Sequence, residues 1–515
     1  MSFNKGKILF LILVILVIFT RFYRLNWDNG FSFHPDENNM AVSVSKMSFS
    51  RLNPNFFAYG QFPLYLTFFT TPKLNLPTIT LTFRFWSAIF SSFSIVVFYF
   101  IGQKIFSSSK LSFIFCLLLV FTPGLIQSSH FGTTESILIF IFSLNIFLSF
   151  LIYDHPQKNI YLFLSGIISG IGLATKISAA IFITPICLSF LFIFLKNPKK
   201  FFGLILKFLI LITITLFFSV LLSPYNLIDS SKFLSSMGYE IGVANGSIPI
   251  FYTRQFIGSL PYLFQFQKIF PYVNGISVFI FSFIGLGFII KTFFKRQKNV
   301  YLLITLFSGL IYFLYQGQLF AKWTRFMSPI FFCGPLLSLF LFKKLKNKFL
   351  EFIFIILAII PGIYFFINTY FFPDIRVQAT NWINQNIPAQ SQVLSEGGNV
   401  VDIPINNSNN LNINNFDFYT LDDEFSSFQK LNSIIKESEY IFIPSRRVFK
   451  NQNNPSFPLS QKYYQSLFSG KLGFSLVKTF SKSNSLFLNA ENAEETWSVF
   501  DNPVVRIFSS NENYH

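Results

Sequence analysis

Two adjacent carboxylates and an imidazole follow the first apolar segment of the chain, in the motif His34-Pro35-Asp36-Glu37. Only eight of the 22 acidic residues precede Asp374, so this pair stands out. Near a hydrocarbon boundary, carboxylates persist where they are solvated, paired or functional. A proline followed by acids also suits an ordinary helix N-terminus. A partly desolvated carboxylate gains the basicity of a general base, so the motif predicts acid-base chemistry in this loop.

A second histidine and carboxylate, His130 and Glu135, are expected at the same face of the membrane. Imidazole and carboxylate oxygens together can hold a divalent cation. We therefore consider His34, His130 and Glu135 as ligands of a metal ion such as Mg²⁺ or Mn²⁺. The alternative for Glu135 is a charge that stabilises the N-terminus of the helix it begins.

Four basic residues lie where the topology predicts the outer face: Lys176, Arg254, Lys322 and Arg325. Single basic residues often extend toward lipid head groups, which is one interpretation. The other is a binding site for an anionic group such as a lipid-linked phosphate, since Arg offers two-pronged hydrogen bonds and Lys a point charge. We favour the second interpretation for Lys176 and Arg325 and leave both open for Arg254 and Lys322.

The elements that position these residues are apolar segments. Hydrophobic residues make up 52% of the chain and charged residues 12%, which is typical of a polytopic membrane protein. Segments of about 20 residues can cross a bilayer. Eleven are predicted, near 7–25, 79–103, 110–127, 135–153, 159–174, 177–195, 203–222, 272–291, 299–315, 326–342 and 349–371. The first of these we interpret as an uncleaved transmembrane helix, because no small-residue cleavage site follows it.

Lysine and arginine cluster in alternate short loops, such as 196–200, 291–298 and 343–348. By the positive-inside rule these loops are cytoplasmic, which places the N-terminus inside and the C-terminal region outside. The net charge of +18 then reflects membrane topology, and nucleic-acid binding is not expected. The three cysteines lie in apolar stretches without metal-ligand spacing, so neither disulfides nor a cysteine zinc site are expected.

Two outer loops are long, 26–78 and 223–271, and each is expected to contain short helices along the interface. Residues 1–373 form the predicted transmembrane domain. After Asp374 the chain becomes richer in Asn, Ser and acids, which predicts a small soluble α/β domain over 374–515. A helix is expected near Val377–Ile383, strands near 392–394, 440–443, 474–477 and 504–508, and an Asn-rich loop at 406–415.

The order of these motifs resembles the GT-C superfamily of membrane glycosyltransferases, in particular the protein-O-mannosyltransferase and aminoarabinose-transferase-like group. The resemblance spans nearly the whole chain. It is carried by the following segments: His34–Glu37, Asn53–Pro63, Arg84–Ala88, Ser129–Phe131, Lys176, Ser223-Pro224-Tyr225, Arg325 with Pro329, and the tail Val499–Phe508.

The resemblance implies an all-α polytopic fold with a small extracytoplasmic α/β domain, in the cell membrane of a bacterium. It implies transfer of a sugar from a polyprenyl-phosphate donor to a glycan, lipid or protein acceptor among membrane lipids. Asp36 would be the base of a direct inverting displacement, and Glu37 would orient the acceptor or share a metal site. Lys176, Arg325, Tyr225, Arg254 and Lys322 would bind the donor phosphate.

Two other functions stay open at this stage. A transporter or flippase of a lipid-linked glycan would carry charges at mid-membrane and show related halves, neither of which is evident here. A glycan polymerase or ligase of another GT-C branch would use outer arginines and a large outer loop without an aspartate in the first loop. The Asp36-Glu37 pair favours the transferase.

Overall fold

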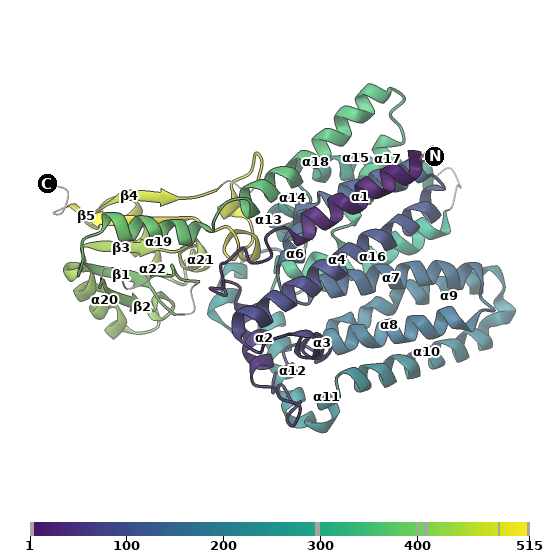
Figure 1. The fold of residues 1–515 in the computed structure, drawn as a ribbon, viewed down its shortest axis with the longest axis horizontal. Helices are drawn as coiled ribbons and strands as arrows, with labels where there is room; N and C mark the ends of the chain where they lie inside the picture. Colours follow the sequence, from purple (N-terminus) through teal and green to yellow (C-terminus); the bar gives the residue numbers. More distant parts are fainter. Residues whose placement is uncertain (1–4, 294–298, 399–400, 406–409, 483–484, 512–515) are drawn as a thin grey trace.

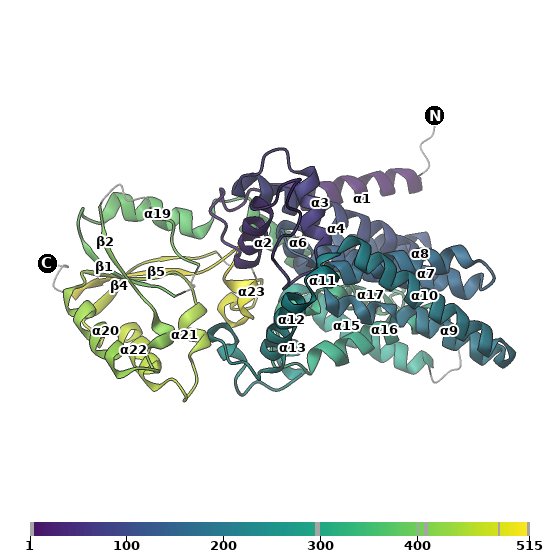
Figure 2. The ribbon, with the colours of Figure 1, turned by 90° about the horizontal axis from the view of Figure 1, so that it is seen from below.

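The computed structural model describes residues 5–293, 299–398, 401–405, 410–482 and 485–511. A bundle of long helices carries a small α/β unit at one end (Figure 1). Helix α1 (Lys5–Phe22) begins at the opposite end of the bundle from this unit, in both views (Figures 1 and 2).

Each predicted membrane segment corresponds to a helix or to helices joined by a short break. Among the described residues, six helices are long and apolar enough to cross a membrane, or up to nine when each bent pair counts as one span. The two short apolar helices α1 and α8 lie outside that count, so the total of eleven stays a prediction. The bundle elements are α1 (Lys5–Phe22), α4 (Leu76–Phe106), α5 (Ser109–Val120), α6 (Pro123–His130), α7 (Glu135–Asp154), α8 (Asn159–Thr175), η1 (Ile177–Ile183), α9 (Thr184–Lys196), η2 (Pro198–Lys200), α10 (Phe201–Leu222), α15 (Ile276–Phe293), α16 (Val300–Gly317), η4 (Thr324–Ile330), α17 (Cys333–Phe342) and α18 (Lys348–Tyr370).

Both long loops contain short helices, as predicted, and they lie at the end of the bundle that faces the α/β unit (Figure 2). The first loop holds α2 (Pro35–Ser45) and α3 (Phe62–Thr70). The second loop and the residues after it form α11 (Tyr225–Ile228), α12 (Ser230–Asn245), η3 (Phe251–Phe256), α13 (Leu263–Lys268) and α14 (Phe270–Val273). The two long loops therefore lie beside the α/β unit.

The C-terminal unit is a five-stranded sheet in the order β2-β1-β3-β5-β4. Strand β1 pairs in parallel with β2 and β3, whereas β5 is antiparallel to β3 and β4. Its elements are α19 (Ile375–Asn386), β1 (Gln392–Glu396), β2 (Asn412–Phe416), η6 (Phe418–Thr420), α20 (Phe425–Glu437), β3 (Tyr440–Ile443), α21 (Arg447–Asn451), α22 (Pro458–Phe468), β4 (Phe474–Phe480), η7 (Ala490–Asn492), α23 (Glu495–Ser498) and β5 (Val505–Ser510).

The predicted helix near Val377–Ile383 and all four predicted strands are present. The prediction of an Asn-rich loop at 406–415 is wrong in part, because residues 412–416 form β2. Residues 406–409 lie outside the described residues. Strand β2 is an edge strand whose side chains are mostly not buried, so its sequence has no apolar alternation to find. Its backbone pairing with β1 holds it in the sheet.

Between β4 and β5 the chain leaves the sheet and packs into the bundle through α23, which lies between the two units in Figure 2. The Trp497 ring is 1% exposed and stacks on Phe365 of α18, with ring centroids 4.6 Å apart. A carboxylate oxygen of Glu494 accepts hydrogen bonds from the backbone N–H of Thr324 (2.8 Å) and of Thr496 (3.1 Å). The α/β unit is thus tied to the bundle by this inserted segment as well as by the α18–α19 connection.

Candidate active site

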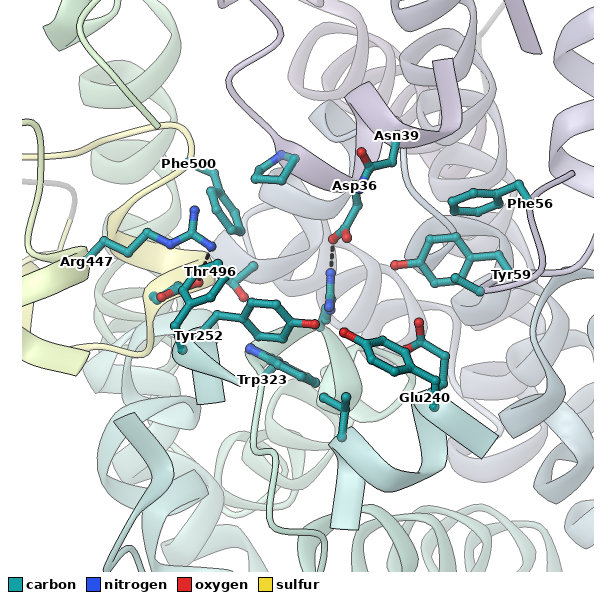
Figure 3. Close-up of a pocket in the computed structure, with 17 residues that line it drawn as sticks. Asp36, Asn39, Phe56, Tyr59, Glu240, Tyr252, Trp323, Arg447, Thr496 and Phe500 are labelled. Atoms are coloured by element: carbon teal, nitrogen blue, oxygen red, sulfur yellow. Dashed lines mark ion pairs between the residues drawn. The ribbon is translucent and has the colours of Figure 1, made fainter. Parts of the chain in front are cut away.

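Asp36 lies at a cavity of about 350 Å³ between the bundle and the α/β unit (Figure 3). The cavity wall combines charged groups with many aromatic rings, a mixture suited to binding a polar ligand that has apolar faces. Its lining residues are Pro35, Asp36, Asn39, Phe56, Ala58, Tyr59, Tyr239, Glu240, Val243, Phe251, Tyr252, Trp323, Arg325, Arg447, Glu495, Thr496 and Phe500.

Helix α2 separates the two adjacent carboxylates, because successive helix positions differ by about 100° around the axis. Asp36 points into the cavity (Figure 3). Its carboxylate forms an ion pair with the Arg325 guanidinium. The Asp36 side chain is 21% exposed. His34 lies behind it, with 3.9 Å between its Nδ1 atom and an Asp36 carboxylate oxygen. Burial, and after it the nearby Arg325 guanidinium, holds the pKa of His34 well below its usual value, which favours the neutral imidazole.

Glu37 faces the opposite way and is fully buried. Arg84 of α4 donates from Nε (3.1 Å) and Nη2 (2.5 Å) to the Glu37 carboxylate, and the backbone N–H of Gly132 donates to it as well. The same guanidinium pairs with Asp28 at 2.8 Å. Burial raises the pKa of Glu37, and Arg84 opposes this rise. The Glu37 carboxylate therefore joins α2 to α4 and does not line the Asp36 cavity, and its role in orienting the acceptor or sharing a metal site stays a prediction.

A second cavity of about 400 Å³ adjoins the first and reaches toward the ends of α8, α12 and α16. The two share Ala58, Tyr59, Glu240, Trp323 and Arg325, so these side chains form a common wall. We call the first the Asp36 cavity and the second the Lys176 cavity. The remaining residues that line the Lys176 cavity are Lys176, Ile177, Ser178, Ala180, Met237, Ile241, Ala244, Asn245, Tyr315, Gln316, Leu319 and Phe326.

Lys176 is placed in this cavity by the break between α8 and η1, where its backbone is extended. Its ammonium lies 5.1 Å from the ring centroids of both Tyr59 and Phe326. Gly60 brings the first loop to this break, since its N–H donates to Thr175 O at 2.9 Å. A Cβ atom at Gly60 would lie 2.0 Å from a backbone oxygen, so only glycine permits this approach. Burial lowers the pKa of Lys176, while Glu135 and Glu240 act to raise it.

The other predicted phosphate ligands line neither cavity. Arg254 donates to Tyr419 O at 2.8 Å and pairs with Asp423 at 3.5 Å, so it links the second loop to the α/β unit. Lys322 donates to Ser259 Oγ (3.1 Å) and to Phe320 O (2.9 Å), which accounts for two of its three protons. The backbone N–H of Tyr225 donates to the Gln61 side chain at 3.0 Å. Their roles in donor binding stay predictions.

The three predicted metal ligands do not fit a metal site. Both ring nitrogens of His130 contact backbone carbonyls, Ile126 O at 2.8 Å and Tyr23 O at 3.0 Å. The His34 ring packs against Phe131 and Phe500. Among the described residues, no group of three or more His, Cys, Asp or Glu side chains is arranged to hold a metal ion. Glu135 is the first residue of α7, the position that its alternative interpretation requires, and its side chain is buried.

Several cavity residues were not predicted as site residues. Glu240 was detectable in principle, because it is one of the few acids before Asp374 and lies in the second of the two long loops. Burial raises the pKa of its carboxyl group, and Lys176 opposes this rise. Arg447 and Glu495 come from the α/β unit and the inserted segment, with 3.5 Å between Nη2 and Oε1. No local signal marks them, because acids and bases are common in that part of the chain.

Comparisons with known proteins concern the family and the fold of the chain. The family model described as dolichyl-phosphate-mannose-protein mannosyltransferase matches residues 79–222, which run from α4 to α10. Among curated proteins, none matches the chain. The oligosaccharyltransferase AglB from Archaeoglobus fulgidus, in complex with an inhibitory peptide and a dolichol-phosphate, is 12% identical with a TM-score of 0.56, over 94% of this chain and 74% of that one.

Another structure of the Archaeoglobus fulgidus oligosaccharyltransferase, a complex with Zn and sulfate, has 14% identity and a TM-score of 0.51, over 88% of this chain and 71% of that one. ArnT from Cupriavidus metallidurans, bound to undecaprenyl phosphate, is 11% identical with a TM-score of 0.44, over 96% and 97% of the two chains. The resemblance to GT-C membrane glycosyltransferases is confirmed by the family match and by the fold shared with the oligosaccharyltransferase. The chain is an integral membrane protein with a glycosyltransferase-type fold.

Proposed function

We propose that this protein is an inverting glycosyltransferase that moves a sugar from a polyprenyl-phosphate donor to an acceptor at the extracytoplasmic face of the membrane. The observation that carries the proposal is the common wall of the two cavities. On it, Arg325 faces both the Asp36 carboxylate and the cavity that holds Lys176. A base and two cations thus flank one point at which a sugar-phosphate bond can be placed.

In this mechanism the donor phosphate lies in the Lys176 cavity and the acceptor enters the Asp36 cavity. Asp36 accepts the proton of the acceptor hydroxyl, whose oxygen forms a bond to the anomeric carbon. The bond from that carbon to the phosphate oxygen breaks on the opposite face, so the configuration inverts. Lys176 and Arg325 stabilise the charge that develops on the departing lipid phosphate. Asp36 then releases its proton to solvent.

Before the donor binds, the Asp36 carboxylate is paired with the Arg325 guanidinium. A carboxylate paired with a guanidinium is a weaker base than a free one, because the cation favours the ionised form. A donor phosphate gives Arg325 an alternative anionic partner with two-pronged geometry. Binding of the donor therefore frees Asp36 to act on the acceptor.

The test is transfer of radiolabelled sugar from a panel of polyprenyl-phosphate donors to cell-envelope acceptors by the purified protein. Transfer with inversion at the anomeric carbon supports the proposal. Movement of a donor across a vesicle membrane without formation of a glycosidic bond would instead support a transporter.

Replacing Lys176 by Met is expected to raise the KM for the donor about tenfold to a hundredfold, since a hydrogen bond to a charged group contributes about 1.5–3 kcal/mol. The KM for the acceptor should stay within about twofold, because Lys176 does not line the Asp36 cavity. Steady-state kinetics with each substrate varied in turn measures both constants. Lys232→Met removes the same charge from the second loop outside both cavities and serves as the matched control. If Lys176→Met changed the acceptor KM more than the donor KM, the donor phosphate would bind outside the Lys176 cavity.

A further inference from the structure

A third cavity, which we call the outer-loop cavity, adjoins the Asp36 cavity and has a volume of about 330 Å³. Asn39 and Phe56 line both cavities. Asn39 stands three residues after Asp36 on α2, so Asn39 and Asp36 lie on one face of that helix, and Figure 3 shows Asn39 beside Asp36. The other lining residues are Val42, Ser43, Lys46, Arg51, Asn53, Pro54 and Asn55. A ligand in this cavity would extend directly to the proposed base.

The charged side chains that line the outer-loop cavity are positive. Among the described residues that line it, Lys46 and Arg51 are the charged ones, and none carries a carboxylate. Both are exposed, and in the described part of the chain neither forms an ion pair. The other polar side chains at the wall are three asparagines and a serine, which suit hydrogen bonds to hydroxyl groups.

The cavity is held in shape by hydrogen bonds within the first loop. Ser43 Oγ donates to Pro54 O at 2.6 Å, which ties α2 to the segment after it. Ser48 and Arg51 exchange two backbone hydrogen bonds of 3.1 and 2.9 Å in a tight turn. Met47, Leu52 and Phe56 pack in an apolar cluster below. The two cations therefore project from a fixed frame.

We propose that the outer-loop cavity is the acceptor subsite and that the acceptor is an anionic saccharide. This inference rests on the proposed transferase function and adds the class of acceptor. Asn39, Asn53 and Asn55 would bind sugar hydroxyls, while Lys46 and Arg51 would bind carboxylate or phosphate groups on the saccharide. A phospholipid fits less well, because the wall offers only Val42, Pro54 and Phe56 to an acyl chain.

The test is binding of a fluorescent oligogalacturonate to the purified protein in nanodiscs of neutral phosphatidylcholine, measured by fluorescence anisotropy. A neutral maltooligosaccharide of the same length is the comparison ligand. We expect the anionic probe to bind at least tenfold more tightly than the neutral one. The double variant Lys46→Gln/Arg51→Gln should lose this tenfold preference. The double variant Lys73→Gln/Lys471→Gln removes the same charge from exposed positions away from the cavity and should retain it.

Equal binding of the two probes, or a preference that survives in the Lys46→Gln/Arg51→Gln variant, would overturn the inference. A second set of nanodiscs contains both phosphatidylcholine and phosphatidylglycerol. Weak binding of oligogalacturonate, together with an enrichment of phosphatidylglycerol around the protein that the Lys46→Gln/Arg51→Gln variant abolishes, would also overturn the inference, since the cavity would then hold lipid head groups. The outcome is separate from that of the proposed function. Asp36→Asn should keep the preference for the anionic probe whether or not the protein transfers sugar.

Discussion

Replacing Asp36 by Asn is expected to lower the rate of sugar transfer by about 10²–10⁴-fold, the usual contribution of a positioned general base. The change keeps the shape of the side chain and removes the charge that accepts the proton. Because Asp36 is 21% exposed at the cavity, the fold should tolerate the amide. The rate is measured in single turnovers with donor and acceptor saturating, and the melting temperature in nanodiscs reports on folding.

Asp229→Asn is the matched control, because it removes a carboxylate from the second loop that pairs with Lys232 and lines neither cavity. This variant should transfer sugar at a rate within about twofold of the wild-type rate. Full activity of a folded Asp36→Asn protein would keep the transferase class but assign the base elsewhere, with Glu240 the first candidate since it shares the cavity wall. Loss of donor binding in Asp36→Asn would instead show that the aspartate acts by positioning Arg325.

The sequence predicted most of the fold because apolar length and charge placement determine membrane segments. The segments at 135–153 and 349–371 match α7 and α18 closely. The edge strand β2 was missed because its side chains do not alternate in burial. The inserted segment around Trp497 was also missed, since its apolar residues are buried by packing against α18, which no local pattern reveals.

For the candidate site, the sequence marked the motif from which Asp36 reaches the cavity, but not the direction of its side chains. In the sequence, Asp36 and Glu37 are two adjacent carboxylates that nothing distinguishes. Only the orientation of α2 about its axis places Asp36 at the cavity and Glu37 against Arg84. His130 looked like a metal ligand because histidines are rare in the chain, yet its ring stacks on Tyr370 with centroids 3.8 Å apart. Arg447 reaches the cavity from a separate unit, and contacts of that kind depend on tertiary structure.

Replacing Arg84 by Met is expected to lower the free energy of unfolding by about 3–5 kcal/mol, the cost of breaking a buried ion pair by removal of one partner. Arg84 is 1% exposed and neutralises both Asp28 and Glu37, which are 1% and 0% exposed. Without it, two carboxylates remain buried side by side. Since Glu37 is adjacent to Asp36 on α2, the rate of transfer should fall as well. Thermal or denaturant unfolding in nanodiscs measures the loss, with Lys73→Met at an exposed position as the control.

The pH dependence of the Arg84→Met protein distinguishes lost charge pairing from lost packing. Burial already raises the pKa of Glu37, and removal of the guanidinium that opposes this should raise it further. A carboxyl group whose pKa is higher in the folded state binds more protons when the protein is folded. The free energy of unfolding therefore falls as the pH rises above the pKa that the group has in the unfolded chain. The variant should therefore lose more stability relative to wild type at pH 8 than at pH 5. Adding Asp28→Asn and Glu37→Gln should remove this pH dependence and recover part of the stability. If the loss of stability did not depend on pH, and were the same in the variant that combines Arg84→Met with Asp28→Asn and Glu37→Gln, Arg84 would act through packing alone.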